Sequence, residues 1–412
     1  MKIRIVEALV VVCVAACQEE RHGSTAPLSV TTDSAGIEIV ENARPPDDSR
    51  LGWRIGPGPT VSIGEVEGED PYLLHDVSDA MMFGDGRIVV ANSGTSELRV
   101  FNGSGTHVST WGGEGEGPGE FSWLRAVEPW PGDSLLAWYG PRRDISVFDA
   151  DGKYGRSFTF EPSDNDPGSW ALVPELTTRD GLIFAMHDPH LLITVTAEVR
   201  DADGRLVSSL GSYPGQEMAL VTATMVDAIL FSVRLPRATW DDLFVIGPTD
   251  RYELKAFAGD GTLARIVRRA HEIRAVTRAH IDAHVEEILS PPYPDDWTES
   301  EIEGYLAEER QRYRAAPVVE NFPAFASVMS DALDHLWVEE YEVPGEERPG
   351  VLWTVFDPVG RVLGFVETPA GLEILEIGED YILGQARDEL GVEYVQVWPL
   401  ERSGGRLAWG PE

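Results

Sequence analysis

The stretch DISVFDADGKYGRSF, residues 144–158, predicts the basic structural unit of this chain. It reads as an apolar strand that ends in a tight polar turn, followed by a second strand. Asp149 and Asp151 suit such a turn because their carboxylates bond to nearby backbone, and Gly152 suits it because glycine tolerates positive φ. We therefore expect a β-hairpin at this position.

The same hairpin recurs at a nearly regular interval. Copies of its turn lie at residues 100–105, 147–152, 199–204, 256–261 and 355–360, with a weaker sixth copy at 397–405. Their final glycines lie at 105, 152, 204, 261, 360 and 405, so the intervals are 47, 52, 57, 99 and 45 residues. This period indicates a repeat architecture, in which the interval of 99 residues is too long for one repeat.

A second turn runs in step with the first. It lies at residues 84–86, 132–133, 179–181, 241–242, 332–334 and 378–380, and a hydrophobic strand follows each copy. Two turns and about four strands in each 45 to 50 residues are typical of a β-propeller blade. We therefore predict an all-β fold, a six-bladed β-propeller of four-stranded blades.

The long interval has a helical pattern. Ile281, Val285 and Leu289 recur at helical spacing, and Thr298 with Glu301 fits a capping box ahead of a second helix. The proline-rich residues 290–296 separate the two helices. A helical insertion of about residues 271–316 is therefore expected between blades four and five.

Three parts of the chain carry a family resemblance. The motifs GEGPGEF, LLAWY and DISVFDADGKYGRSF are similar to those of six-bladed β-propellers of the NHL type, and the similarity extends over about residues 60–405. The resemblance implies the propeller fold. It implies no reaction, because propellers carry many unrelated functions.

The glycine-rich stretch WGGEGEGPGEF, residues 111–121, admits three interpretations. It lacks the glycine register and the following helix of a phosphate-binding loop. It approaches the Gly-Gly-x-Gly-x-Asp motif of calcium β-rolls, but it occurs once and has Glu in place of Asp. Similar stretches at residues 63–72 and 210–217 favour a connector that leads from an outer strand to the inner strand of the next blade.

The copy at residues 63–72 also suggests how the ring closes. It follows a strand at about residues 60–64, before any complete blade. That strand can serve as the outer strand of blade six, which would leave the ring without an exposed edge. The C-terminal residues 406–410, RLAWG, compete for the same place.

The N-terminus has the features of a secretory signal. Lys2 and Arg4 precede a short apolar run at residues 8–16, which is too short for a membrane-spanning helix. Residues 14–17, VAAC, resemble a bacterial lipobox, and the resemblance implies cleavage before Cys17 and lipidation of that residue. An ordinary cleaved signal or an uncleaved anchor are the alternatives.

The predicted domain organisation follows from these features. Residues 1–17 form the lipoprotein signal, residues 18–35 a flexible tether and residues 36–412 the propeller. By the same resemblance, Gln18 after the cysteine implies the outer membrane, so the expected location is the cell envelope. The lipid chains would anchor the protein there.

Composition limits the classes of partner. The 412 residues are 42% hydrophobic and carry a formal net charge of −37, so the chain can bury a large core and is unsuited to bind nucleic acid. We expect a monomer whose partner is an unidentified protein, peptide or glycan.

Candidate residues for chemistry are few. His280, His284 and Glu287 share a face of a predicted helix, where they could bind zinc or lie on a solvated surface. His187 and His190 could meet near a loop, and a polar loop is the simpler interpretation. Twelve tryptophans suit either inter-blade packing or an exposed platform, for which Trp170, Trp240 and Trp297 are the candidates.

The predicted function is that of an envelope-tethered binding or interaction module without catalysis. No catalytic, cofactor-binding or metal-binding residue is assigned, and lipidation at Cys17 is the one assigned modification. The alternative is a calcium-dependent, lactonase-like hydrolase with its site in the central tunnel. Its candidate calcium ligands are Asp76, Asp79, Glu128 and Glu175.

Overall fold

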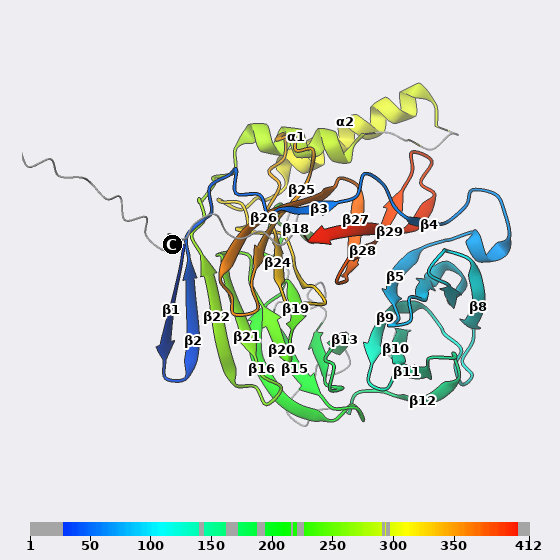
Figure 1. The fold of residues 1–412 in the computed structure, drawn as a ribbon. Coiled ribbons are helices and arrows are strands. Elements are labelled where there is room, and N and C mark those ends of the chain that lie inside the picture. Colours follow the sequence, from blue (N-terminus) through cyan, green and yellow to red (C-terminus); the bar gives the residue numbers. More distant parts are fainter. Residues whose placement is uncertain are drawn as a thin grey trace, which may run out of the picture.

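Six β-sheets form a ring of blades around a common axis in the computed structural model (Figure 1). The structure describes residues 28–139, 144–161, 172–187, 194–215, 217–220, 226–290, 293 and 297–402. Cys17, Trp170 and His190, and the stretch at residues 406–410, lie outside the described residues. The predicted six-bladed propeller of four-stranded blades is confirmed.

Each blade is an antiparallel sheet whose strands run in order from the axis to the rim. The first three blades contain β5 (Val77–Met82), β6 (Ile88–Asn92), β7 (Glu97–Phe101) and β8 (His107–Gly112); β9 (Leu124–Trp130), β10 (Ser134–Tyr139), β11 (Asp144–Asp149) and β12 (Tyr154–Phe158); and β13 (Leu172–Thr177), β14 (Ile183–His187), β15 (Thr194–Arg200) and β16 (Leu206–Pro214).

The last three blades follow the same order. They contain β19 (Arg237–Trp240), β20 (Leu243–Ile246), β21 (Glu253–Phe257) and β22 (Leu263–Arg269); β23 (Val328–Ser330), β24 (Leu336–Glu339), β25 (Gly350–Phe356) and β26 (Val362–Pro369); and β27 (Leu372–Ile377), β28 (Tyr381–Arg387) and β29 (Glu393–Arg402) with β3 (Trp53–Ile55) and β4 (Val61–Ile63). A small hairpin, β17 (Met218–Leu220) with β18 (Val226–Ala228), and the 3-10 turns η1 (Asp70–Tyr72) and η2 (Ser93–Thr95) lie in connections.

The predicted hairpin turns are confirmed between the third and fourth strands of blades one to five. In blade two, one carboxylate oxygen of Asp149 accepts the N–H groups of Asp151 (3.0 Å) and Lys153 (2.9 Å), while Gly152 has φ +78°. The weak sixth copy was wrong, because residues 397–402 continue strand β29. Blade six takes its outer strand from the other end of the chain, so it has no such hairpin.

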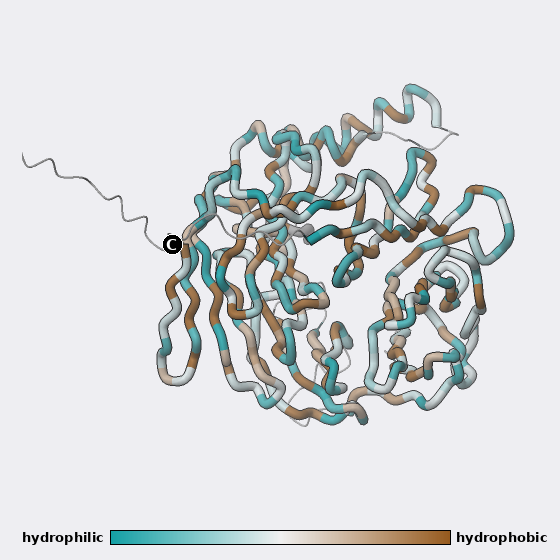
Figure 2. Tube along the Cα trace, in the orientation of Figure 1, coloured by the Kyte–Doolittle hydropathy of each residue, from teal (hydrophilic) through white to brown (hydrophobic). Residues whose placement is uncertain are grey.

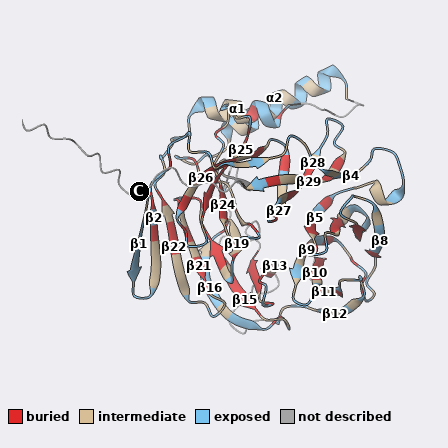
Figure 3. Ribbon diagram, in the orientation of Figure 1, coloured by how far each residue is buried: buried red, intermediate tan, exposed pale blue. Residues whose placement is uncertain are grey.

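The hydrophobic core lies between neighbouring blades, where buried strand residues face one another (Figure 3). Apolar and polar residues alternate along many of the strands (Figure 2). The connector at residues 111–121 contributes to this packing, since the Phe121 ring is buried 5.2 Å from that of Tyr139. A Cβ on Gly112, where φ is +81°, would lie 2.3 Å from the Phe121 ring. The predicted blade-to-blade connector is confirmed.

An N-terminal strand closes the ring, as residues 60–64 predicted. Strand β4 pairs antiparallel with β29, with Ile63 opposite Val395, and the N–H of Thr60 donates to the carbonyl of Val397 (2.8 Å). Strand β3 pairs with the end of the same strand. Blade six is therefore built from both ends of the described chain.

A buried carboxylate also fastens the end of β29. Asp331, in the first turn of blade five, accepts hydrogen bonds from Trp337 Nε1 (2.9 Å) and from the Arg402 guanidinium (2.6 Å), and His335 Nδ1 lies 3.1 Å away. The Arg402 guanidinium lies over the Trp53 ring, 4.6 Å from its centroid. Although burial opposes it, hydrogen bonds from His335, Trp337 and Arg402 lower the pKa of Asp331 to about 2. Its charge is therefore well stabilised.

The expected tether at residues 18–35 was wrong in its last part. Residues 29–34 form β1 (Ser29–Ser34), which pairs with β2 (Ile37–Asn42). Strand β2 lies parallel to β22 and extends blade four to six strands. The buried Asn42 amide donates to the carbonyls of Arg268 and Gly360 (both 3.0 Å), so the hairpin contacts blades four and five. The sequence of residues 29–34 is polar, which concealed a strand that is exposed on most of its surface.

The predicted helical insertion between blades four and five is confirmed. It contains α1 (Arg278–Ile288) and α2 (Glu299–Ala315), which lie together beside the ring at the top of Figure 1. Thr298 and Glu301 form the predicted capping box. Neither α-helix of the described chain has the length and apolar character that a membrane span requires.

Ring closure generates the first prediction. Replacing Ile63 with Ala should lower the free energy of unfolding by about 2–4 kcal/mol, because Ile63 is buried between blades six and one. The neighbouring Ser62→Ala variant is the control, since Ser62 is exposed and should change stability by less than about 0.5 kcal/mol. Urea denaturation measures both. Equal free energies of unfolding for the two variants would contradict closure of the ring by β4.

Candidate functional site

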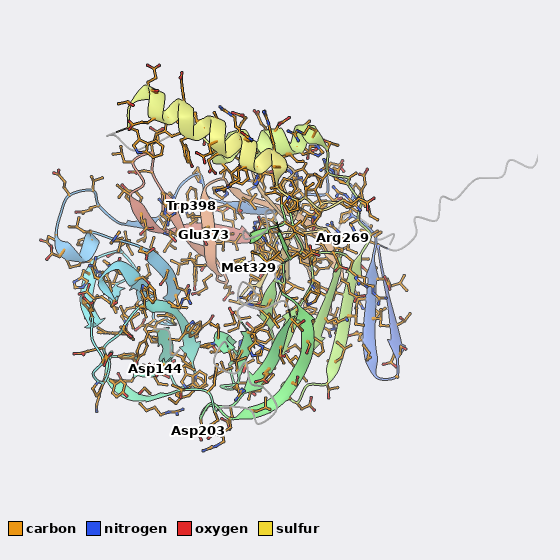
Figure 4. All side chains as sticks on the ribbon, turned by 180° about the vertical axis from the view of Figure 1, so that it is seen from behind. Asp144, Asp203, Arg269, Met329, Glu373 and Trp398 are labelled. Atoms are coloured by element: carbon orange, nitrogen blue, oxygen red, sulfur yellow. The ribbon has the colours of Figure 1, made fainter. Side chains whose placement is uncertain are left out.

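Carboxylates gather at the axis of the ring, where the innermost strands of the blades meet. Asp79 lies on β5, Glu128 on β9, and Glu373 and Glu376 on β27. Figure 4 places the labelled Glu373 and Met329 towards the middle of the ring, whereas Asp203 lies at its rim. The axis of this propeller is thus acidic.

Two of these carboxylates connect neighbouring blades. One oxygen of Asp79 accepts the N–H of Val127 in blade two (3.1 Å), and the other accepts the N–H of Ala80 (2.8 Å). Glu376 of blade six accepts the N–H of Met82 in blade one (2.8 Å) and the hydroxyl of Tyr381. Both side chains therefore use both of their oxygens within the protein.

The close approach of these negative charges at the axis destabilises their ionised forms. Burial, together with the charges of Glu376 and Glu373, raises the pKa of Asp79 to about 7, although the Val127 and Ala80 N–H groups lower it. Burial and then the charges of Asp79, Glu376 and Glu175 raise the pKa of Glu128 well above its ordinary value. Near neutral pH, the cluster therefore holds protons that exposed carboxyls would have lost.

The structure brings together only part of the predicted calcium ligands. Asp79, Glu128 and Glu175 interact at the axis, although Glu175 also forms an ion pair with Arg237. Asp76 is exposed with φ +55°. In the described part of the chain, no group of three or more His, Cys, Asp or Glu side chains could hold a metal ion.

Sequence reasoning missed Glu373 and Glu376. The signal was present in the register of the inner strands, because Glu373 precedes its turn glycine, Gly378, by five residues, as Asp79 precedes Gly84. Alignment of the six inner strands on their turns would have found Glu373. Glu376 lies between the turn and an irregularity in the pairing of β27 with β28, at a position where blade one has no carboxylate.

A second feature is a pocket of about 860 Å³ between the helical insertion and blades three to five, here called the helix-covered pocket. Its walls come from residues 229–237 ahead of β19, from both helices, and from the start of β23. Phe231, Leu235, Tyr313, Val328 and Tyr341 supply apolar and aromatic surface. Its volume lies in the range of small-ligand sites, about 300–1,000 Å³.

Ion pairs and aromatic contacts hold the helices over this pocket. Arg310 of α2 pairs with Glu286 of α1 (2.8 Å), and Arg314 pairs with Asp282 (3.2 Å). The His284 ring packs on the Phe231 ring, with 4.9 Å between centroids, and burial lowers the pKa of His284. The insertion is therefore attached to the segment that lines the pocket.

The predicted histidine sites have structural roles. His280 caps α1, where its Nδ1 accepts the N–H of Thr277 (3.1 Å), and its ring lies 5.1 Å from that of Phe322. His284 packs on an aromatic ring, so these two histidines lie on a packed surface and the expectation of a solvated helix face was wrong. His187 is buried and its Nδ1 accepts the N–H of Thr196 (3.1 Å).

Two expectations about tryptophans were also wrong. Trp240 is buried, with 1% of its surface exposed, and its Nε1 donates to the carbonyl of Asp334 (2.7 Å). Trp297 is partly buried against Tyr305, with 5.2 Å between ring centroids. The exposed tryptophan is instead Trp123, with 72% of its surface exposed. No platform of the predicted residues exists in the described chain.

The axial carboxylates generate a pH-dependent prediction for Glu128→Gln. The raised pKa means that the fold favours protonated Glu128, so this contribution to stability is present below about pH 4.5 and is lost as pH rises through the folded-state pKa. The Gln variant should therefore be more stable than wild type at pH 8, by about 1 kcal/mol or more, and similar to it at pH 4.

Denaturation at both pH values checks this expectation. Glu116→Gln is the matched control, because Glu116 is exposed on the connector at residues 111–121. A Glu128→Gln variant that is less stable than wild type at pH 8 would contradict the described electrostatics.

Comparison with known proteins finds similar folds at low identity. No family model matches the sequence, and no curated protein matches it. A protein from Bacteroides fragilis described as exported is 12% identical, with 88% of this chain and 99% of that chain covered and a TM-score of 0.47. A DUF4221 family member from Bacteroides vulgatus is 10% identical, with 85% and 99% covered and a TM-score of 0.48. A gluconolactonase from Xanthomonas campestris is 16% identical, with 86% and 91% covered and a TM-score of 0.39. These similarities carry no argument about function.

Proposed function

We propose that this chain is an envelope-tethered β-propeller that binds a ligand in the helix-covered pocket and catalyses no reaction. The pocket itself carries the proposal. It combines a ligand-sized volume of about 860 Å³ with aromatic walls and a few charged groups, which is the usual composition of a binding site. The helical insertion supports this role, because it interrupts the repeat and supplies one wall of the pocket.

The alternative of a calcium-dependent hydrolase at the axis has less support. Asp79 and Glu376 accept hydrogen bonds from backbone N–H groups of neighbouring blades, and Glu175 pairs with Arg237. A metal ion would compete with these contacts for the same carboxylate oxygens. The axial carboxylates are better explained as links between blades, whereas the helix-covered pocket has no comparable role in closing the ring.

The tether rests on the sequence of the N-terminus. The basic start, the short apolar run and the resemblance of residues 14–17 to a lipobox support cleavage before Cys17 and its lipidation. Gln18 supports an outer-membrane location. The 12 residues from Cys17 to Leu28 would span at most about 40 Å when fully extended, so the propeller would stay close to the membrane. The NHL-like character of the repeat stays a prediction.

Blocking the helix-covered pocket tests the binding proposal. Ser232 lines the pocket and is partly exposed, so Ser232→Trp should fill part of it and abolish binding of small aromatic probes. Two fluorescent probes serve, 1-anilinonaphthalene-8-sulfonate and N-phenyl-1-naphthylamine, which share their rings. We expect wild type to bind at least one of them with 1:1 stoichiometry.

Ser104→Trp is the control, because Ser104 is exposed in the outer hairpin turn of blade one. This variant should bind the probes as wild type does. Probe binding that survives Ser232→Trp, or that is absent from wild type, would overturn the assignment of this pocket.

Substitution of Cys17 tests the tether. A Cys17→Ser variant expressed in a bacterial host should move from the membrane fraction to the soluble fraction or keep its signal, because serine cannot form the thioether with lipid. The mature mass should lose the acyl chains. Unchanged fractionation and unchanged mature mass would contradict lipidation at this residue.

A further inference from the structure

We infer that the ligand of the helix-covered pocket is a small organic anion whose acidic group pairs with Arg234 and whose apolar or aromatic body contacts Phe231 and Tyr341. This inference rests on the proposed binding function and adds the chemical class of the ligand. It is argued from the charges that line the pocket, from the anchoring of Arg234 and from the aromatic walls.

The charge of the pocket differs from that of the whole chain. The chain has 33 Lys and Arg against 70 Asp and Glu, yet the described residues that line the pocket include three arginines and one carboxylate, Glu175. Arg237 pairs with Glu175, and Arg312 pairs with Glu309 at 3.1 Å. Arg234 remains, and its guanidinium makes no hydrogen bond or ion pair with any described residue. A cation without a direct partner among the described residues marks a place for an anion.

Arg234 is fixed at its backbone while its side chain faces the cavity. Its N–H donates to the Thr249 hydroxyl (2.9 Å), and its carbonyl accepts the N–H of Thr249 (3.1 Å). Thr249 is buried, with 1% of its surface exposed. The backbone that carries this side chain is therefore fixed before a ligand arrives, and the exposed guanidinium can turn to meet an anion.

A cavity of about 680 Å³ adjoins the helix-covered pocket, and its lining is acidic. This difference in charge determines which of the two cavities suits an anion. Arg234, His284 and Tyr341 line both cavities, but the adjoining one also contains a group of carboxylates. These are Glu287, Glu339, Glu342, Glu346 and Glu347, which outnumber the two arginines of the same lining, Arg234 and Arg348. An anion would be repelled from this side and held in the helix-covered pocket, with Arg234 at the boundary.

Glu339 is the carboxylate that competes most directly for Arg234. It forms no ion pair with Arg234 among the described contacts, and its carboxylate accepts the Ser327 hydroxyl (2.6 Å). Burial raises the pKa of Glu339, against Ser327 and the charge of Arg234, which lower it. Glu339 therefore neutralises the charge of Arg234 only in part. A ligand anion in direct contact with Arg234 would neutralise that charge further.

The walls beside Arg234 suit an apolar body. The Phe231 ring lies 5.1 Å from that of Phe322, which in turn lies 5.5 Å from that of Tyr341. Leu235 and Val328 add aliphatic surface. A ligand that combined an acidic group with rings or a short chain would thus satisfy both kinds of surface at once.

The two naphthyl probes measure this preference, because they share their rings and only 1-anilinonaphthalene-8-sulfonate carries an anion. We expect wild type to bind the sulfonate at least about tenfold more tightly than the neutral amine at low salt, as one charge-assisted contact contributes about 1.5–3 kcal/mol. Arg234→Ala should weaken sulfonate binding by about tenfold or more and change amine binding by less than about twofold. Arg234→Lys should restore part of the difference.

Arg251→Ala is the control, because Arg251 is exposed and pairs with Asp250 on the surface. It should leave both affinities unchanged. Equal affinities for the two probes in wild type, with both lost in Ser232→Trp, would overturn the anionic class and keep the pocket as a binding site. Loss of neither probe in Ser232→Trp would instead overturn the pocket.

Discussion

The pairing of β4 with β29 is the constraint on which the rest of the ring depends. It joins residues as far apart in sequence as Thr60 and Val397, which are 337 positions apart. Because β4 completes the last blade, β5 can pack against β27 and β28, and the inner strands can meet at one axis. Without it, the edge of β29 would be open to pairing with other chains. The entropy cost of closing so long a loop grows only slowly with length, so a compact core around Ile63 can offset it.

Two kinds of buried carboxylate follow from this closure, and they act on stability in opposite directions. Asp331 accepts hydrogen bonds from Trp337 and Arg402, its pKa is about 2, and its charge stabilises the fold above about pH 4. Asp79 lies among like charges at the axis, its pKa is about 7, and its charge destabilises the fold as pH rises towards 7. Closing the ring brings the inner strands together and thereby concentrates the carboxylates that they carry.

The sequence predicted the repeat well because its turns require particular residues. A tight turn requires residues such as Asp149, which bonds to nearby backbone, and Gly152, which tolerates positive φ, in any fold. The spacing of such turns along the sequence therefore predicted the number of blades. The same logic failed for residues 29–34, since an exposed edge strand has no apolar pattern to reveal it. It also failed for the sites. The helix-covered pocket is lined by residues 229–237, by both helices and by blade five. These segments are far apart in sequence, and no local sequence pattern predicts that they meet.

The contrast between axis and pocket explains why the insertion, and not the ring, is the better place for a function. Asp79 and Glu376 at the axis each connect two neighbouring blades, so a change in either disturbs contacts between blades. Most of residues 229–237 and both helices lie outside the strands of the blades, where replacing a side chain that does not pack in the core costs little in ring stability. A cation such as Arg234 can therefore persist there within a chain of net charge −37, held at its backbone by Thr249. The acidic surroundings then act as a filter, because they repel an anion whereas that residue attracts it.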